Sequence, residues 1–118
     1  KLEPSKPMRF DSPAGIPILV GKNNLQNDKL TFTAEPNEWW LHAKDMPGSH
    51  VIVASENPDE ETLHMAARLA ARYSKGASAG KVPVDMTRRR YGKKPSGAKP
   101  GFVVYTNQTT VLAEPWEG

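Results

Sequence analysis

The chain has 118 residues, of which 37% are hydrophobic and 25% charged, and its formal net charge is +3. This length fits one domain with its own core, and the balance of residues excludes a chain that is disordered throughout. Because the sequence has no cysteine, a disulfide framework, a thiolate zinc site and a cysteine nucleophile are excluded. No apolar run approaches the about 20 residues that span a bilayer.

The first residue is lysine rather than methionine, which indicates a piece cut from a longer protein. We expect residues 1–7, "KLEPSKP", to be the remnant of a linker and residues 8–118 to form a single domain.

The first part of the chain predicts β-structure. Residues 8–12 and 16–22 are expected to form a hairpin, in which Pro17 favours an edge or the start of a strand. Residues 29–34 alternate, which predicts a further strand with Leu30, Phe32 and Ala34 on one face.

The next predicted hairpin joins residues 39–44 to residues 49–55 through the turn "DMPG". In its first strand, Trp39, Leu41 and Ala43 are expected on one face and Trp40, His42 and Lys44 on the other. Trp39 is the candidate for the core, while the place of Trp40 stays open.

One long helix is predicted from the N-cap Asn57 to the stop at Gly76, with a stripe of leucine and alanine at helical spacing. Residues 81–91 alternate weakly, and residues 102–114 predict a last strand or strand pair with a turn at "TNQT". The fold class is therefore α+β, with a mainly antiparallel sheet and one long amphipathic helix packed on it.

Positive charge is concentrated in residues 75–101, which hold eight basic residues and one acidic residue, a net charge of +7. The rest of the chain holds eight basic and twelve acidic residues, a net charge of −4. This asymmetry favours a polyanionic partner, with nucleic acid ahead of an acidic membrane surface, although a solvated charged loop is the alternative. The candidate phosphate contacts are Arg88, Arg89, Arg90, Lys93 and Lys94.

Amide side chains cluster in "GKNNLQND", which does not match a Walker A motif. The cluster offers donors and acceptors that suit sugar, phosphate and base edges. Alternatively, these side chains satisfy turn backbone and cap a short helical turn. The candidate RNA contacts here are Lys22, Asn23, Asn24, Gln26, Asn27 and Asp28.

The segment "WWLHAKDMPGSHVIV" contains His42 and His50, which with Asp45 make at best an incomplete ligand set for zinc. Ser49 lacks the pattern of a nucleophile elbow. A binding edge is favoured, because an indole, an imidazole and an ammonium are groups that hold unpaired bases and backbone. The candidate RNA contacts are Trp40, His42, Lys44 and His50, and no metal or cofactor is expected.

Taken in order, "MRF", "ILVGKNNLQNDKLT", "WWLHAKDMPGSHVIV" and the helix near Glu60 resemble the NFACT-R domain. This is the C-terminal module of ribosome quality control factors of the RqcH/NEMF type, whose bacterial members were long labelled fibronectin-binding proteins. The resemblance covers nearly the whole chain from Met8. The family pattern falls on Gly21, Lys22, Asn23, Asn24, Gln26, Asn27, Asp28, His42, Lys44, Pro47, Gly48, Ser49 and His50.

The resemblance implies a cytoplasmic, RNA-associated binding module that is not itself an enzyme. Its implied partners are the large ribosomal subunit, tRNA and other domains of the parent protein, with no membrane. The parent protein is implied to act on obstructed large subunits and to recruit tRNA for template-free tailing. The rival readings are an RNA-processing enzyme that uses His42 and His50 as acid and base, and a module that binds host matrix protein such as fibronectin.

Overall fold

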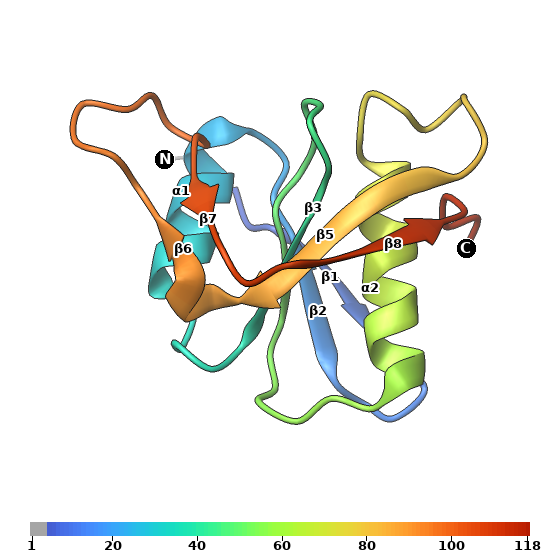
Figure 1. Ribbon diagram of the computed structural model, residues 1–118. Helices are drawn as coiled ribbons and strands as arrows, with labels where there is room; N and C mark the ends of the chain where they lie inside the picture. The colour runs from blue at the N-terminus through green and yellow to red at the C-terminus, as the bar shows by residue number, and fades with distance from the viewer. Residues whose placement is uncertain (1–4) are drawn as a thin grey trace.

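The computed structural model describes residues 5–118, so the expected linker at residues 1–7 lies partly outside the described residues. Its main feature is a six-stranded antiparallel sheet in the order β1-β2-β4-β3-β5-β8, with a helix on each face (Figure 1). The elements are β1 (Met8–Asp11), β2 (Pro17–Val20), α1 (Asn24–Thr33), β3 (Trp39–Ala43), β4 (Val51–Val53), α2 (Glu60–Arg72), β5 (Val82–Arg88), a 3-10 turn (Arg89–Tyr91), β6 (Gly92–Lys93), β7 (Val104–Tyr105) and β8 (Thr109–Ala113).

The α+β class and both predicted hairpins are confirmed, since β1 pairs with β2 and β3 pairs with β4, each antiparallel. The long helix α2 begins at Glu60 with Asp59 as its N-cap, two residues later than the expected cap Asn57. The end of the chain was predicted as one strand or a strand pair, and it forms two strands. They do not pair with each other, because β7 pairs with β6 and β8 pairs with β5.

The strand predicted at residues 29–34 is wrong, because this segment lies in helix α1. The helix starts in the amide cluster, where the Asn23 side chain accepts a hydrogen bond from the Gln26 amide at 2.9 Å. The Gln26 side chain in turn accepts one from the Lys22 amide at 2.9 Å. This reciprocal capping nucleates the helix, and the helix then runs through the apparent alternation of Leu30 and Phe32.

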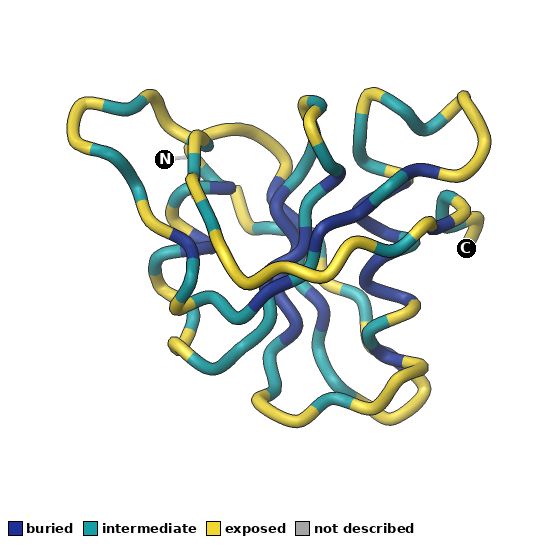
Figure 2. The backbone as a smooth tube through the Cα atoms, viewed as in Figure 1, coloured by how far each residue is buried: buried dark blue, intermediate teal, exposed yellow. Residues whose placement is uncertain are grey.

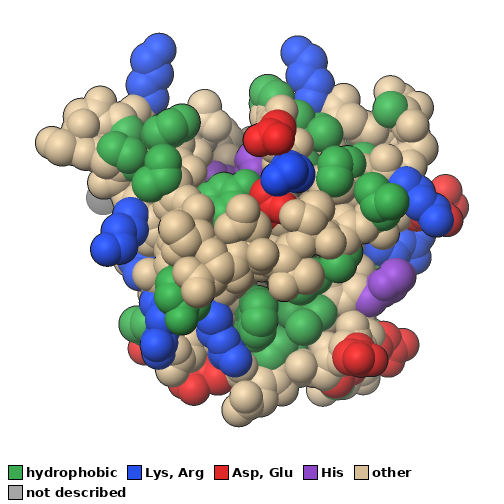
Figure 3. Space-filling view, in the orientation of Figure 1, with side chains coloured by type: hydrophobic (Ala, Val, Ile, Leu, Met, Phe, Trp, Pro, Cys, Tyr) green, Lys and Arg blue, Asp and Glu red, His purple; other side chains and the backbone are tan. Residues whose placement is uncertain are grey.

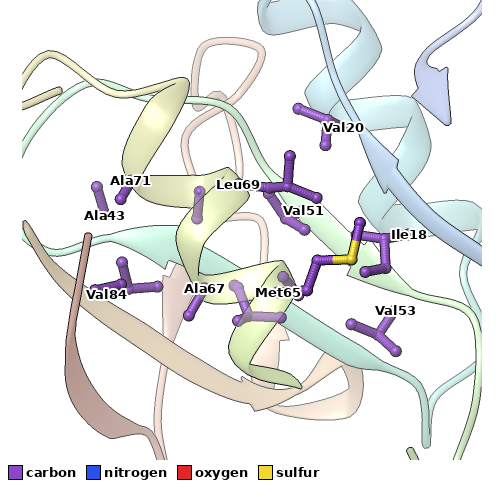
Figure 4. Packing of buried hydrophobic residues seen from close by; sticks show 14 of the residues in the cluster. Ile18, Val20, Ala43, Val51, Val53, Met65, Ala67, Leu69, Ala71 and Val84 are labelled. Atoms are coloured by element: carbon purple, nitrogen blue, oxygen red, sulfur yellow. The ribbon is translucent and has the colours of Figure 1, made fainter. Parts of the chain in front are cut away.

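Helix α2 covers one face of the sheet and builds the larger core. Its alanines Ala66, Ala67, Ala70 and Ala71 are buried, and their small side chains let the helix lie close to the strands (Figure 4). They pack with Leu69 against apolar residues of β2, β3, β4 and β5 such as Ile18, Leu41, Val51, Val53 and Val84. This face has the composition of an ordinary hydrophobic core.

The other face is covered by α1 and by residues 92–105, hereafter the arm, which consists of β6, a long loop and β7 (Figure 1). Beneath them lies a smaller cluster of Leu30, Trp40 and Ile52. Trp40, left open from sequence, is 2% exposed and belongs to this cluster. Trp39, expected in the core, is half-buried, and the Arg88 guanidinium lies 4.6 Å from its ring centroid. Figure 2 shows exposed and intermediate residues mixed along the arm, beside the buried central strands.

Candidate nucleic-acid interface

His50 is the centre of a buried hydrogen-bond network between the sheet, α1 and the arm. Its Nδ1 lies 2.7 Å from the Thr31 hydroxyl and 3.2 Å from the Trp40 indole nitrogen. Its Nε2 lies 2.9 Å from the Gly101 carbonyl oxygen in the arm. The side chain is 2% exposed. The ring therefore links three segments and has no open polar atom.

The partners of His50 fix its tautomer. An indole N–H only donates, so Nδ1 accepts, and a carbonyl only accepts, so Nε2 carries the proton and donates to Gly101. Burial, together with the neighbouring His42, lowers the pKa of His50 to about 4. Protonating Nδ1 would set its N–H against the Trp40 N–H. The ring is consequently a neutral structural element near neutral pH.

Asn27 connects the amide helix to the same network. Its side-chain oxygen accepts a hydrogen bond from the His50 amide at 3.1 Å, and the Gly21 amide donates to the His50 carbonyl at 3.1 Å. A Cβ on Gly21 would lie 2.0 Å from that Asn27 oxygen. Position 21 therefore has room only for glycine, which explains the glycine two residues before the N-cap of α1.

Asp28 ties the arm to α1. Its carboxylate accepts hydrogen bonds from the Gly101 amide and the Lys94 ammonium, both at 3.1 Å. Partial burial opposes ionisation of Asp28, but the Gly101 amide and Lys94 outweigh it and lower the pKa. Gly101 also has a left-handed backbone, φ 87°, and packs against Asn24. Both polar backbone atoms of Gly101 are therefore used to hold the arm in place.

The far end of the arm is held by buried Asp85 on β5. Its carboxylate accepts hydrogen bonds from the Tyr105 hydroxyl at 2.6 Å and from Thr110 at 2.5 Å. The Lys44 ammonium lies 3.9 Å from the same carboxylate. Burial and the bond to Asp85 raise the pKa of Tyr105, so this hydroxyl stays protonated and donates. Lys44 therefore lies on the arm side of the sheet, as the alternation predicted.

The turn between β3 and β4 is held by the end of α2. The Ser49 amide donates to the Tyr73 carbonyl at 2.9 Å, and the Lys75 amide donates to the Pro47 carbonyl at 2.9 Å. A Cβ on Gly48 would lie 3.2 Å from the Ser74 side chain. The "PGS" of the family pattern thus fixes the position of the turn beside the cavity described next.

Between the arm and β3 lies a cavity of about 280 Å³. Its lining residues are Trp40, His42, Asp45, Met46, His50, Gly101, Phe102, Val103 and Tyr105. Figure 3 shows histidine atoms at the floor of this hollow, with apolar side chains around it. His42 stacks on Trp40 with ring centroids 5.7 Å apart and planes 9° apart. Burial lowers the pKa of His42, so its ring is an uncharged face near neutral pH.

The three arginines make contacts within the protein. Arg88 donates to the backbone carbonyls of Asn37 and Glu56, each at 2.7 Å. Arg89 donates to the Thr31 carbonyl at 3.0 Å and lies over the Phe32 ring. Arg90 donates to the Asn37 side chain. These guanidinium groups join β5 and its 3-10 turn to the neighbouring loops, which is a structural use of their charge.

The lysines are placed differently. Lys22, Lys93 and Lys99 are exposed, and among residues 5–118 none of the three forms an ion pair. Lys22 follows Gly21, and Lys99 lies two residues before Gly101, so each is close in sequence to a residue of the His50 network. These lysines are accessible cations on this side of the sheet, and Arg90, which is also exposed, lies beside Lys93.

The structure brings the amide helix, His42, Lys44 and His50 to one side of the sheet. It does not expose all of them, since Trp40, His50 and Asn27 are each 4% exposed or less. Direct RNA contact by these three side chains does not fit their burial, and Asn23 and Gln26 cap α1. The sequence interpretation did not include Thr31, Gly101, Phe102 and Tyr105, and it considered Asp45 only as a metal ligand. The sequence pattern that could have pointed to Phe102 is an aromatic residue directly after the glycine of a basic loop.

Two further observations concern metal binding and membrane-spanning helices. In the described part of the chain, residues 5–118, no group of three or more histidine, aspartate or glutamate residues is arranged to hold a metal ion. No helix in that part is long and apolar enough to cross a bilayer.

Comparison with known proteins identifies the family. Residues 9–100 match the family model described as the NFACT protein RNA-binding domain. The chain is 50% identical over 118 residues to the "Rqc2 homolog RqcH" of Bacillus subtilis and 49% identical over 115 residues to that of Streptococcus suis. These alignments cover 98% and 95% of the chain but 21% of each relative, so the chain spans about a fifth of their length.

A solved structure shares the fold. It is the C-terminal part of the fibronectin/fibrinogen-binding protein from Streptococcus suis, with a TM-score of 0.93 and 47% identity. The match covers 98% of this chain and 48% of the solved one. The predicted resemblance is thus confirmed, and the chain belongs to the NFACT-R family of RNA-binding domains, which forms the C-terminal part of RqcH-type proteins.

Proposed function

We propose that this domain is the RNA- and ribosome-associated binding module of a cytoplasmic ribosome quality control factor. The parent protein would act on obstructed large ribosomal subunits and recruit tRNA for template-free tailing. The domain contributes binding and no catalysis. The observation that carries the proposal is the 50% identity to an RqcH relative over almost the whole chain.

The side of the sheet that carries α1 and the arm is the proposed RNA surface. It combines exposed lysines, namely Lys22, Lys93 and Lys99, with the polar residues Asn24 and His42. Ammonium groups on flexible stems suit phosphates, whose contact supplies affinity that depends on salt and not on sequence. Lys44 and Lys94, near the buried and partly buried carboxylates Asp85 and Asp28, belong to the rim of the same surface.

An RNA-processing enzyme that uses His42 and His50 as acid and base fits the geometry less well. Both nitrogens of His50 are occupied within the protein, and one of them faces an indole N–H. The pKa values of both rings are lowered by burial, so neither is suited to hold a proton near neutral pH.

The test is binding of this chain to total tRNA and to purified large ribosomal subunits over a range of salt. We expect the logarithm of affinity to fall linearly with the logarithm of salt concentration. The double variant Lys93→Gln, Lys99→Gln should flatten that slope by about 1 to 2, since each lost phosphate contact removes about 0.7 to 0.9.

The matched control is Lys81→Gln, because this exposed lysine ends the loop that follows α2 and lies beside His64 and Arg68 of that helix, away from the arm (Figure 1). The control should leave the slope unchanged. Equal slopes for all three proteins would contradict the proposed surface. Binding to immobilised fibronectin but to neither RNA would favour the matrix-binding alternative instead.

A further inference from the structure

The cavity between the arm and β3 is suited to recognise one particular chemical group of an RNA, and not only its phosphate backbone. We propose that it holds one unpaired guanine base, with the Asp45 carboxylate on the Watson–Crick edge of the base and Phe102 as its stacking partner. This inference rests on the proposed RNA-binding function and names the nucleotide that the surface selects.

The walls of the cavity are aromatic. Phe102 is 55% exposed and lies in the arm directly after the anchored Gly101, and the rings of His42 and Tyr105 line the same hollow. Unpaired bases are held in proteins by stacking on such rings. A volume of about 280 Å³ is near the lower limit for small-ligand sites, so it suits a single base rather than a base pair.

The polar lining selects among the bases. Asp45 is the acidic residue of the lining, and the lining contains no lysine or arginine. A carboxylate therefore favours a ligand that offers N–H donors and disfavours a phosphate. Guanine presents two adjacent donors, N1–H and the N2 amino group, which match the two carboxylate oxygens. Adenine, cytosine and uracil each place an acceptor beside their donor, so none makes the same pair.

The cations lie outside the cavity. Lys44 follows His42 by two residues with its ammonium near Asp85, and Lys99 precedes Gly101 by two residues and is exposed. A nucleotide whose base enters the cavity would therefore place its phosphates near ammonium groups at the rim. Asp45 is an exposed residue of the cavity lining and the lysines lie outside that lining, an arrangement that matches the separation of base and phosphate in a nucleotide.

The cavity is built before any ligand arrives. Gly101 is fixed on both backbone atoms by His50 and Asp28, and Tyr105 is fixed by Asp85. Asp45 has a left-handed backbone with φ 55°, which holds it at the turn after β3. A rigid aromatic site loses less entropy when it binds a base than a mobile loop would.

The experiment measures fluorescence anisotropy of labelled uridine octamers that carry one central guanosine, adenosine, cytidine or uridine, at one low salt concentration. For the unmodified chain we expect the guanosine octamer to bind at least about fivefold more tightly than the others, as for a good bidentate base contact. Affinity for total tRNA and for large ribosomal subunits is measured with the same preparations.

The discriminating variant is Asp45→Asn. Asparagine tolerates a left-handed backbone as well as aspartate does, so the turn is retained. A carboxamide offers one acceptor beside one donor, and all four bases present a matching donor beside an acceptor, so asparagine no longer singles out guanine. We expect the preference for guanosine to disappear and the four octamers to bind with similar affinity.

Phe102→Ala tests the stacking partner. It should weaken binding of every octamer by about fivefold or more without changing the order of preference. The matched control is Leu112→Ala, an apolar side chain that is 68% exposed on β8 and outside the cavity lining. The control should leave all affinities unchanged.

Equal affinities of the unmodified chain for the four octamers, with tRNA and subunit binding retained, would overturn the guanine site and leave the proposed function standing. A guanosine preference that survives Asp45→Asn would also overturn it. If neither tRNA, subunits nor octamers bind, the proposed function fails and the guanine site fails with it.

Discussion

The two faces of the sheet are built from different chemistry. The α2 face is apolar and packed with alanine, valine and leucine, whereas the α1 face combines a three-residue apolar cluster with a buried network around His50. The α1 face carries a cavity lined by several aromatic side chains. The comparison separates a face that stabilises the domain from a face that positions a binding site.

The two faces also differ in the burial of polar atoms. Around His50 the contacts with Thr31 and Asn27 join the sheet to α1, the contact with Gly101 joins it to the arm, and the contact with Trp40 lies within the sheet region. Buried hydrogen bonds contribute modestly to stability but define geometry strictly, because a lost partner leaves a desolvated group. Changes on the α2 face should therefore affect stability, and changes on the α1 face should affect RNA binding as well.

The largest expected effect is on the α2 face. Leu69→Ala removes a fully buried side chain and should lower the free energy of unfolding by about 3 kcal/mol, measured by urea denaturation. RNA affinity under conditions where the variant is folded should not change. Leu112→Ala, at an exposed position, should cost less than about 0.5 kcal/mol. A parallel loss of RNA affinity in Leu69→Ala would break the separation of the two faces.

Acid should weaken the α1 face through His50. Its pKa falls from 6.5 to about 4 on folding, so the unfolded chain binds the proton first. The contribution of His50 to the free energy of unfolding is therefore fully present above pH 6.5. It is lost as the pH falls towards 4, by about 3 kcal/mol in total. Urea denaturation at several pH values measures this.

His50→Gln should flatten that pH dependence, leaving the smaller part that comes from His42, whose pKa is also lowered by burial. His64→Gln, on the exposed side of α2, is the matched control and should leave the pH dependence as it is. An unchanged slope in His50→Gln would show that other groups carry the acid sensitivity.

A smaller effect is expected at Thr31. Thr31→Val keeps the shape of the side chain but removes the hydroxyl beside His50 Nδ1, so stability should fall by about 1 kcal/mol. Thr33→Val is the matched control, because its exposed hydroxyl bonds only to backbone carbonyls of its own helix. Equal stability of the two variants would mean that the Thr31 contact contributes nothing.

The smallest effect on global stability is expected at Asp28, whose pair with Lys94 is partly exposed. Asp28→Asn should cost less than about 1 kcal/mol. Hydrogen exchange of residues 94–103 should nevertheless become faster, while β3 and β4 keep their protection, because the change loosens the arm alone. Unchanged exchange in the arm would show that Asp28 does not hold it.

The sequence was sufficient to predict the two hairpins of the sheet and which residues lie on each face of β3. Alternation between polar and apolar residues indicates the direction of each side chain. It failed at residues 29–34, where Leu30 and Phe32 alternate within a helix. The decisive information lay earlier, in the cap made by Asn23 and Gln26. The amide-rich start was interpreted either as a set of RNA contacts or as caps of a short helical turn, and Asn23 and Gln26 follow the capping alternative.

The site could be predicted only in part. The alternation put Trp40, His42 and Lys44 together, but it gave no measure of how deeply each is covered. The contacts that cover them come from Gly101 and Tyr105 in the arm, far along the chain. Charge counting likewise found the arginines but could not show that Arg88 and Arg89 bind backbone carbonyls. Such long-range pairs depend on the fold and are not encoded in local patterns.

The most direct test of the two-face account is an NMR titration of the isotope-labelled chain with the uridine octamer that carries one guanosine. The account predicts that the shifted amides cluster around the cavity, at Asp45, Gly101 and Phe102, and that α2 stays unchanged. Shifts concentrated on the exposed side of α2, at His64 and Arg68, would contradict it.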